Sequence, residues 1–414
     1  MSTNKAIAVI GGGAAGFFAA ICAAQAARQK VLDIRIFEAS DQVLKKVRIS
    51  GGGRCNVTHN CFDVRLFCQN YPRGSRELLS PMQRFQAKDT VDWFNNAGVQ
   101  LVAEDDGRMF PDTHSSETII ECFFQLIEKF RIKLVPNSPV KSIEVLSPNR
   151  LQLKIGDKQF FTADAVLIAT GSAPGGYRLA ESLGHSITER APSLFSFIIQ
   201  DPLISGLTGL SFADASLKLT LPGLPNKKVF KQRGAVLITH WGLSGPAILK
   251  LSAWAAREMK QSGYNAILSI NWMGAEKPGD VENRLRRMKS ENLKSYLKNV
   301  YPEKLPKRFW LNLLDQCSMD RDKRWAEVSK KELATICRAL VDSPLQISGQ
   351  NRFKDEFVEC GGVALPEIDF KTMQSKICPG LYFAGEILDV DGITGGFNFQ
   401  NAWTTAWVAA QHMV

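Results

Sequence analysis

The feature that most constrains the fold is a glycine-rich turn near the amino terminus, in the stretch AIAVIGGGAAGFFAAICAAQAARQ. The apolar run from Ala6 to Ile10 predicts a buried strand, and the alanine-rich segment after the glycines predicts a helix. Between them, Gly11, Gly13 and Gly16 fill the G-x-G-x-x-G pattern. The first glycine permits a tight turn, the second lets a pyrophosphate approach the backbone, and the third lets helix and strand pack closely. The stretch therefore predicts a Rossmann-like domain that binds a dinucleotide at a helix amino terminus.

An acidic residue downstream supports this interpretation. The segment VLDIRIFEAS predicts a second strand, and Glu38 ends it 22 residues after Gly16, where an acid can bind ribose hydroxyls. An acid there disfavours a 2′-phosphate, so the expected ligand is FAD or NAD. The alternative is a glycine turn that serves helix packing alone, and the surrounding strand, helix and acid make it the weaker interpretation.

Later segments bear on the choice between FAD and NAD. ADAVLIATGS and GLYFAGEILDV each contain a buried strand that ends in glycine, at Gly171 and at Gly385, and a helix is expected to begin at Gly396. An NAD site is normally completed within its local strand–helix–strand units, whereas FAD is longer and reaches later elements. Backbone N–H groups at the Gly396 helix end can lie near flavin N1 and C2=O, where negative charge builds on reduction. Three separated glycine sites therefore favour FAD.

Several motifs together resemble one family. The stretches KVRISGGGRCNVTHN, EDDGRMFP, THWGLSGPAIL, VECGGV and TMQSKICPGLYFAGEILDVDGITGGFNFQNAW are similar to those of the BaiN/aminoacetone-oxidase-type flavoproteins, and the similarity covers nearly the whole chain. The resemblance implies non-covalent FAD in a Rossmann-like domain interrupted by an inserted domain. Members of this family reduce conjugated ketones or oxidise small amino ketones, so the resemblance leaves the substrate open.

The resemblance also implies which residues contact FAD. It places Lys46 and the run from Ser50 to Asn56 along the pyrophosphate and flavin, where the glycines leave room and Arg54 supplies charge-assisted hydrogen bonds. A mobile surface loop is the alternative for this run. The expected cofactor-binding residues are Gly11, Gly13, Ala14, Ala15, Gly16, Glu38, Ala39, Lys46, Ser50, Gly51, Gly52, Gly53, Arg54, Cys55, Asn56, Val140, Ala169, Thr170, Gly171, Gly385, Glu386, Gly395, Gly396, Phe397 and Asn398.

Cys55 raises the question of thiol chemistry. Disulfide reductases of this class use two cysteines with four residues between them, soon after the ribose-binding acid. Cys55 and Cys61 have five residues between them and lie well downstream of Glu38, so a packed thiol is the better interpretation. The spacing of Cys55, His59, Cys61 and Cys68 matches no zinc site, and no metal is expected.

His240, in LITHWGLSGPAIL, is the candidate catalytic residue. It follows an expected strand and can donate a proton to a reduced substrate, whereas a structural hydrogen bond is the alternative for a lone histidine there. No second G-x-G-x-x-G with its strand and helix is present, so no dedicated NADPH domain is expected. Electrons would come from NAD(P)H visiting the flavin transiently, or from the substrate itself and pass to oxygen or a quinone.

The expected fold class is α/β, with a discontinuous FAD-binding domain over residues 1–190 and 345–414 that contains a parallel sheet. Residues 191–275 predict a β-rich, barrel-like insert on the substrate side, and residues 276–344 predict a small, basic, helical insert. The chain of 414 residues carries a formal charge of +10, and the segment from Glu276 to Leu340 has 16 Lys and Arg against 10 Asp and Glu. Such a segment can bind nucleic acid, although a solvated helical face is the favoured interpretation.

The leading functional expectation is an FAD-dependent oxidoreductase. It would transfer hydride through flavin N5 to or from a small or hydrophobic carbonyl or amine compound. The alternatives are an FAD-dependent enzyme that modifies RNA through the basic helical segment, and a flavin redox sensor without turnover. Nine cysteines without a C-x-x-C pair fit a reducing cytoplasm, and no apolar stretch predicts a membrane span.

Overall fold

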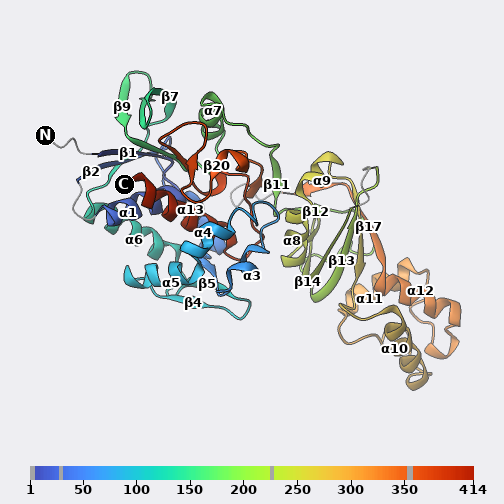
Figure 1. The fold of residues 1–414 in the computed structure, drawn as a ribbon. Coiled ribbons are helices and arrows are strands. Elements are labelled where there is room, and N and C mark those ends of the chain that lie inside the picture. The colour runs from blue at the N-terminus through green and yellow to red at the C-terminus, as the bar shows by residue number, and fades with distance from the viewer. Residues whose placement is uncertain (1–4, 28–30, 224–227, 352–357) are drawn as a thin grey trace. The chain divides into compact units, whose positions relative to one another are not determined.

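The computed structural model describes residues 5–27, 31–223, 228–351 and 358–414 (Figure 1). The chain divides into two compact units, residues 1–191 with 354–414, and residues 192–353. Within the described ranges, no helix has both the length and the apolar character needed to cross a membrane.

The first unit is built on a sheet of seven strands in the order β20-β21-β22-β10-β1-β2-β6. The strands from β22 to β6 run parallel, and β20 and β21 are antiparallel additions at one edge. Their bounds are β1 (Lys5–Ile10), β2 (Leu32–Phe37), β6 (Lys133–Val135), β10 (Ala165–Ile168), β20 (Ile368–Asp369), β21 (Gln374–Ser375) and β22 (Leu381–Phe383). All four residues of β10 are buried, as expected of a parallel strand covered on both faces. The predicted parallel sheet is confirmed.

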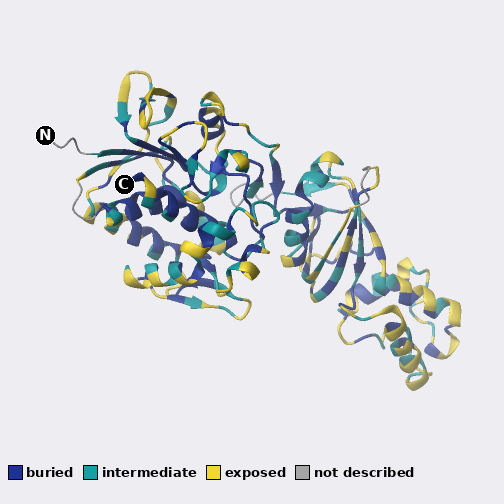
Figure 2. Cartoon of the chain, in the orientation of Figure 1, coloured by how far each residue is buried: buried dark blue, intermediate teal, exposed yellow. Residues whose placement is uncertain are grey.

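Four helices of this unit meet in an aromatic core, the dark blue interior of Figure 2. They are α1 (Ala14–Ala26), α5 (Ala87–Asn96), α6 (Ser116–Lys129) and α13 (Phe397–Met413). Trp403 of α13 is fully buried, with its ring centroid 5.2 Å from that of Phe18 in α1 and 5.8 Å from that of Phe123 in α6. Its indole N–H donates to the carbonyl of Val57 at 2.9 Å. This packing fixes the first turns of α13 beside the segment that follows the glycine run.

The other elements of the first unit are shorter. Of two small antiparallel sheets, β7-β8-β9 lies beside the main sheet, and β3-β5-β4 lies against α5, α6 and α13. The bounds are α2 (Lys45–Gly53), β3 (Thr58–His59), α3 (Val64–Cys68), α4 (Leu79–Arg84), β4 (Leu101–Ala103), β5 (Arg108–Pro111), β7 (Val140–Ser147), β8 (Arg150–Ile155), β9 (Gln159–Ala163), α7 (Pro174–Ser182), β19 (Val358–Cys360), η2 (Leu365–Glu367) and η3 (Gly385–Ile387). The strand β11 (Ala191–Ser193) begins at the last residue of the first unit and continues into the second.

The second unit begins with an antiparallel sheet in the order β17-β16-β13-β14-β15-β12-β18. Because β17 (Ser343–Ile347) pairs at one edge and β18 (Gly349–Asn351) at the other, one nearly continuous segment joins both edges. The insert is β-rich here, as one antiparallel sheet, and its barrel-like form stays a prediction. The remaining elements of the sheet layer are β12 (Ser196–Ile198), β13 (Ser211–Thr220), β14 (Val229–Thr239), β15 (Gly242–Ser244), α8 (Pro246–Trp254), α9 (Ala256–Gln261) and β16 (Ala266–Asn271).

The helical part of the second unit contains α10 (Pro278–Glu291), α11 (Lys307–Gln316), η1 (Trp325–Glu327) and α12 (Lys330–Val341). The predicted return of the chain to the first unit at residue 345 falls too early. Residues 343–351 stay in the insert sheet because Leu345 and Ile347 alternate with exposed residues and are buried in its core.

A buried histidine joins the segment after α7 to the β20–β21 hairpin. His185 Nδ1 lies 3.0 Å from a carboxylate oxygen of Glu367, and its Nε2 lies 2.8 Å from Ser375 Oγ. Ser375 Oγ already accepts from the N–H groups of Ile377 and Cys378. The neutral ring fits this arrangement, with Nδ1 donating to Glu367 and Nε2 accepting from Ser375. Burial lowers the pKa of His185 below its ordinary value, and the hydrogen bond and charge of Glu367 oppose this only in part.

We expect the first unit to lose stability as the pH falls through the ordinary pKa of histidine, about 6.5. Because the folded pKa is lowered, the unfolded chain binds the proton more readily, so the His185 contribution is present above this pH and is lost below it. Urea unfolding at about pH 7.5 and about pH 5.5 measures the loss. In His185→Gln the pH dependence over this interval should become shallower, and an unchanged slope would contradict the assignment.

Candidate functional site

The carboxyl ends of the parallel strands bring the predicted glycine segments together. β1 ends before Gly11, and β10 ends before Ala169. A Cβ on Gly11 would lie 2.5 Å from the carbonyl oxygen of Ala169, and Gly11 has a φ of +112°. Only glycine permits this approach without a backbone shift. Gly171 lies beside Glu386, whose carboxylate would be 3.4 Å from a Cβ on that glycine. In open α/β sheets, this edge is where ligands bind.

The turn between β1 and α1 has the features of a phosphate-binding helix end. The helix begins after Gly13, and no side chain caps its first turn. A Cβ on Gly16 would lie 2.0 Å from the carbonyl oxygen of Gly11, whereas a Cβ on Gly13 would meet no atom within 4 Å. Gly16 therefore serves close packing, and Gly13 faces open space, as the G-x-G-x-x-G pattern predicts. Ala14 and Ala15 follow in the first turn.

Glu38 closes this turn from the end of β2. One carboxylate oxygen accepts from the N–H of Gly12 at 2.8 Å, and the other accepts from the N–H and hydroxyl of Ser40, both at 2.9 Å. Ala39 is exposed beside it. The carbonyl of Glu38 accepts from the N–H of Ser138 at 2.7 Å, which places the segment leading to Val140 next to the same turn. The proposed ribose-binding acid is thus held at the expected strand end.

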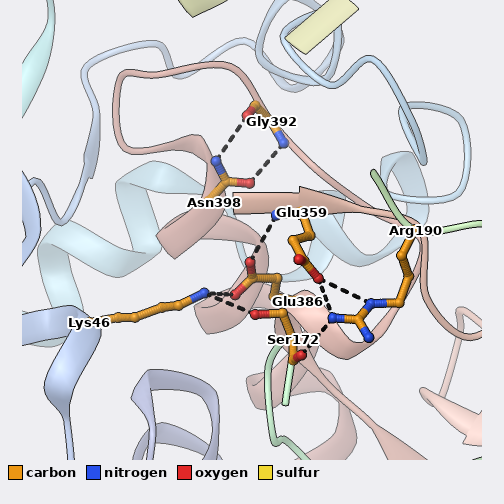
Figure 3. Close-up of polar contacts among 7 residues, drawn as sticks. All are labelled: Lys46, Ser172, Arg190, Glu359, Glu386, Gly392 and Asn398. Atoms are coloured by element: carbon orange, nitrogen blue, oxygen red, sulfur yellow. Dashed lines mark hydrogen bonds and ion pairs between the residues drawn. The ribbon is translucent and has the colours of Figure 1, made fainter. Parts of the chain in front are cut away.

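A charged network connects α2, η3 and the segment after β10 (Figure 3). Lys46 forms an ion pair with Glu386 and lies 3.5 Å from the hydroxyl of Ser172. The other oxygen of Glu386 accepts from the N–H of Glu359 at 3.3 Å. Arg190 forms an ion pair with Glu359, and donates to the carbonyl of Ser172 at 3.0 Å. Lys46 and Glu386 are among the expected cofactor-binding residues, whereas Arg190 and Glu359 are not. No local pattern marks them, because they meet only across 169 residues of chain.

The glycine run that the sequence places along the cofactor is only partly a loop. Lys46 lies in the first turn of α2, and the backbone departs from helical geometry at Ser50, Gly51 and Gly52. The φ angles of Gly51, Gly52 and Gly53 are all positive, between +59° and +83°. A Cβ on Gly52 or Gly53 would meet no atom within 4 Å. The run therefore forms an open backbone turn with room for a ligand.

Arg54 has partners that the sequence prediction did not foresee. Its guanidinium donates to Glu104 at 2.6 Å and lies 4.1 Å from the ring centroid of Phe110. Both partners come from EDDGRMFP, one of the motifs that carry the family resemblance. Arg54 is thus held in place by the chain itself, and its contact with a cofactor stays a prediction.

The start of α13 is fixed by contacts from distant segments. The amide of Asn56, in the orientation that satisfies both of its groups, donates to Thr58 O at 3.0 Å and accepts from the N–H of Gly396 at 2.9 Å. The N–H of Gly396 is therefore engaged, and any N–H that α13 offers to a flavin comes from the residues after it. Asn398 exchanges two hydrogen bonds with Gly392 at 2.8 and 2.9 Å, closing the turn that contains Gly395 (Figure 3).

Residues 70–74 form a second segment that fixes the loop before α13. The sequence did not predict this role. The hydroxyl of Tyr71 donates to the carbonyl of Phe397 at 2.6 Å, and the N–H of Ile393 donates to the carbonyl of Asn70 at 2.9 Å. Arg73 forms a two-pronged ion pair with Asp391, which is fully buried. Because Asp391 precedes a glycine in DVDGITGG, the sequence pattern indicates a turn residue. Its ion pair with Arg73 is visible only in the structure.

Cys55 is fully buried, with a φ of +60°. Burial raises the pKa of its thiol to about 12, and a hydrogen bond with Ser50 opposes this only in part. All nine cysteines are free, and within the described residues no group of three or more His, Cys, Asp and Glu could hold a metal ion. Cys55 has the environment of a packed thiol.

We expect Cys55 to resist alkylation in the folded protein at about pH 8, because the reactive thiolate is scarce when the pKa is far above the ordinary 8.5. Iodoacetamide labelling followed by peptide mass spectrometry tests this. Cys61, which is partly exposed, is the internal control and should be labelled first. In urea, both thiols should react at similar rates, and fast labelling of Cys55 without urea would contradict the interpretation.

The chemistry of the site fits a long anionic dinucleotide. Two helix starts, those of α1 and α13, lack a side-chain cap and present positive dipole ends. The hydroxyl oxygen of Thr170 and the side-chain oxygen of Asn401 are buried without a hydrogen-bond partner in the described chain, so each can form a hydrogen bond with a bound group. Lys46 would offset the negative charge of a pyrophosphate.

His240 belongs to the second unit. It lies exposed in the turn between β14 and β15, with its ring centroid 3.9 Å from that of Trp241 and nearly perpendicular to it. Its proposed role as proton donor stays a prediction.

Comparisons with known proteins agree with this fold. The family model described as the HI0933-like protein Rossmann domain matches residues 5–412. The ribosomal RNA dihydrouridine synthase of Escherichia coli (strain K12) is 29% identical over 98% of this chain and 97% of its own. The 3-dehydro-bile acid delta(4,6)-reductase of Clostridium scindens is 26% identical over 98% of both chains.

Two solved structures share the fold. An open form of a flavocytochrome c3 fumarate reductase matches with a TM-score of 0.50 and 16% identity, over all of this chain and 78% of its own. The 3-ketosteroid delta1-dehydrogenase of Sterolibacterium denitrificans matches with a TM-score of 0.50 and 14% identity, over 99% of both chains. Because the family model spans nearly every residue, the chain belongs to the HI0933-like family and is an FAD-dependent oxidoreductase.

Proposed function

We propose that this protein reduces a carbon–carbon double bond conjugated to a carbonyl group, and that its substrate is a uracil ring in RNA. The observation that carries the proposal is the full-length similarity to relatives with two different names. The E. coli relative and another in Haemophilus influenzae, 28% identical over 99% of this chain, are ribosomal RNA dihydrouridine synthases. The C. scindens relative is a reductase of a 3-dehydro bile acid.

The two activities that these names denote share one chemical step. Dihydrouridine is uridine with its C5=C6 bond saturated, and that bond is conjugated to the C4 carbonyl. A 3-dehydro bile acid with delta-4 and delta-6 double bonds is likewise a conjugated ketone. In both, the carbon at the far end of the conjugated system accepts hydride, and a carbon next to the carbonyl, or one conjugated with it, accepts a proton. One flavin site can therefore serve both reactions.

Bound FAD would supply the hydride, and NAD(P)H as a transient donor would restore it. The chain's own residues would bind and orient the cofactor. The uncapped start of α1 and the ammonium group of Lys46 would hold the pyrophosphate. Glu38 would accept from ribose hydroxyls. The N–H groups after Gly396 would face the end of the flavin where negative charge builds on reduction.

The charge of the helical part of the insert supports RNA over a small ketone. Its excess of six positive charges lies on one short segment, from Glu276 to Leu340, and such an excess attracts a polyanion. A free steroid-like enone needs no such charge. The small conjugated ketone remains the second candidate because the C. scindens relative acts on one.

The test follows the visible spectrum of the purified protein under anaerobic conditions. NADH or NADPH should bleach the bound flavin, and deproteinised ribosomal RNA added afterwards should restore the oxidised spectrum. Mass spectrometry of the digested RNA should find a uridine that has gained two hydrogens. If a conjugated ketone restores the spectrum and RNA does not, the substrate is the small compound. If no flavin is bound and none can be added back, the redox proposal fails.

We also propose His240 as the proton donor. Removal of a general acid typically costs at least about a hundredfold in rate, so His240→Gln should slow reoxidation by substrate by about that factor. Bleaching by NAD(P)H should proceed at the parent rate, because that step needs no proton donor to the substrate. Slowing of both steps, or of neither, would refute this role.

A further inference from the structure

The helical part of the insert carries an exposed tyrosine with two cations close to its ring. The ammonium of Lys298 lies over the ring of Tyr296, 5.6 Å from its centroid, and the guanidinium of Arg324 lies over it at 5.7 Å. Tyr296 is 37% exposed and Leu293 is 49% exposed. We call Leu293, Lys294, Tyr296, Lys298 and Arg324 the Tyr296 surface. These residues come from the loop after α10 and from the segment that enters η1.

Backbone pairing makes the Tyr296 surface a defined structure. Tyr296 and Arg324 form an isolated antiparallel bridge. Around it, the N–H of Leu297 donates to Lys323 O at 2.9 Å, and the N–H of Trp325 donates to Ser295 O at 3.0 Å. The two loops are therefore joined edge to edge, with Tyr296 and Arg324 facing each other across the bridge.

Two buried tryptophans support the surface from below. Trp310 and Trp325 are both fully buried. The indole of Trp310 donates to the carbonyl of Leu297 at 2.7 Å, and that of Trp325 donates to the carbonyl of Val300 at 3.3 Å. The two indoles hold the loop in place, and a rigid aromatic platform loses little entropy when a ligand binds.

Two cationic side chains of the Tyr296 surface, those of Arg324 and Lys294, are available to a ligand. Lys298 is paired with Asp322. Arg324 and Lys294 are exposed, and neither has an ion-pair partner in the part of the chain that the structure describes. Asp320 and Glu327 lie nearby in sequence and limit the local charge. The surface therefore suits one or two phosphates together with a flat ring, and not a long run of anionic groups.

We propose that the Tyr296 surface binds single-stranded RNA, with a base stacked on Tyr296 and neighbouring phosphates on Arg324 and Lys294. An aromatic ring flanked by cations is the arrangement that binds an unpaired base and its backbone. The inference rests on the RNA substrate proposed above and adds a binding surface outside the flavin-binding unit. A uracil that undergoes reduction must be unstacked, and a separate platform for flanking nucleotides would hold the strand while this occurs.

The test measures binding of a fluorescein-labelled uridine oligoribonucleotide to the full-length holoprotein by anisotropy. Loss of one stacked base should weaken binding at least about fivefold in Tyr296→Ala, whereas Tyr296→Phe should bind as the parent does. Arg324→Gln should reduce the slope of log affinity against log salt by about 0.7. Phe160→Ala, which removes a 61% exposed aromatic residue from the first unit, is the matched control and should change nothing.

The outcomes separate this proposal from the redox proposal. Parent-like binding by a folded Tyr296→Ala, judged by its circular dichroism and melting temperature, overturns the Tyr296 surface. So does a parent protein that reduces a conjugated ketone and binds no RNA, and the redox function then stands. If the flavin is never reduced but binding depends on Tyr296, the surface stands and the proposed reaction fails.

Discussion

Gly16→Ala is expected to destabilise the first unit by about 3 kcal/mol and to abolish FAD binding. The added methyl would lie 2.0 Å from the carbonyl oxygen of Gly11 and 3.3 Å from a methyl of Val9. Neither the strand end nor the helix can move without breaking the turn. Inside a helix, alanine ordinarily stabilises by about 1 kcal/mol relative to glycine. A loss of stability in Gly16→Ala would therefore have the opposite sign to the change that helix propensity predicts. It would show that the methyl group clashes with the carbonyl oxygen of Gly11.

Gly13→Ala is the matched control. Gly13 has a φ of −94°, which any residue can adopt, and a Cβ there meets no protein atom within 4 Å. The apoprotein should therefore keep its stability, while FAD binds about tenfold more weakly because the methyl occupies the approach of the pyrophosphate. Urea unfolding of the apoproteins and flavin fluorescence titration measure the two effects. Parent-like FAD affinity in Gly13→Ala would show that the pyrophosphate does not pass over Gly13.

The sequence predicts the local structure of this turn well because its signals are local. A strand, a glycine turn and a helix lie within the first 26 residues, and each glycine has a steric reason that spacing alone reveals. The later strand ends at Gly171 and Gly385 could be predicted for the same reason. Parallel strands must end at one edge of the sheet, so their terminal glycines must meet there.

The partners that fix the site could not be predicted, because they are far apart in the sequence. Arg54 has the residue type expected of a cofactor ligand, but its contact with Glu104 depends on β5 folding back against the glycine run. The N–H of Gly396 is engaged by Asn56, 340 residues earlier. Similarly, the strands β17 and β18 form the two edges of the insert sheet through pairing with β16 and β12 that no pattern within residues 343–351 reveals. Local propensity carries no information on such contacts.

Asp391→Asn is expected to destabilise the first unit by about 3 to 5 kcal/mol, because it removes a fully buried carboxylate charge that pairs with the guanidinium of Arg73. Asp391 is fully buried, and the side chain of Arg73 is 12% exposed. Solvent therefore cannot replace the lost carboxylate charge. The pair also joins residues 70–74 to the loop before α13, where the hydroxyl of Tyr71 holds the carbonyl of Phe397. We expect FAD affinity to fall together with stability, since this loop leads into the predicted flavin-binding helix end.

Asp33→Asn is the control with the same chemistry and different burial. Asp33 receives three hydrogen bonds from Arg35 and one from Lys133, and the side chains of Asp33 and Arg35 are 27% and 33% exposed. Its loss should cost less than about 1 kcal/mol, as is typical of ion pairs that water reaches. Urea unfolding of both variants as apoproteins measures the difference. Equal losses would mean that burial does not increase the contribution of the Arg73–Asp391 pair to the free energy of unfolding.

Replacing the buried pair with Arg73→Met and Asp391→Leu together should recover part of the stability without restoring FAD affinity. That result would separate the packing role of the pair from its role in shaping the loop before α13.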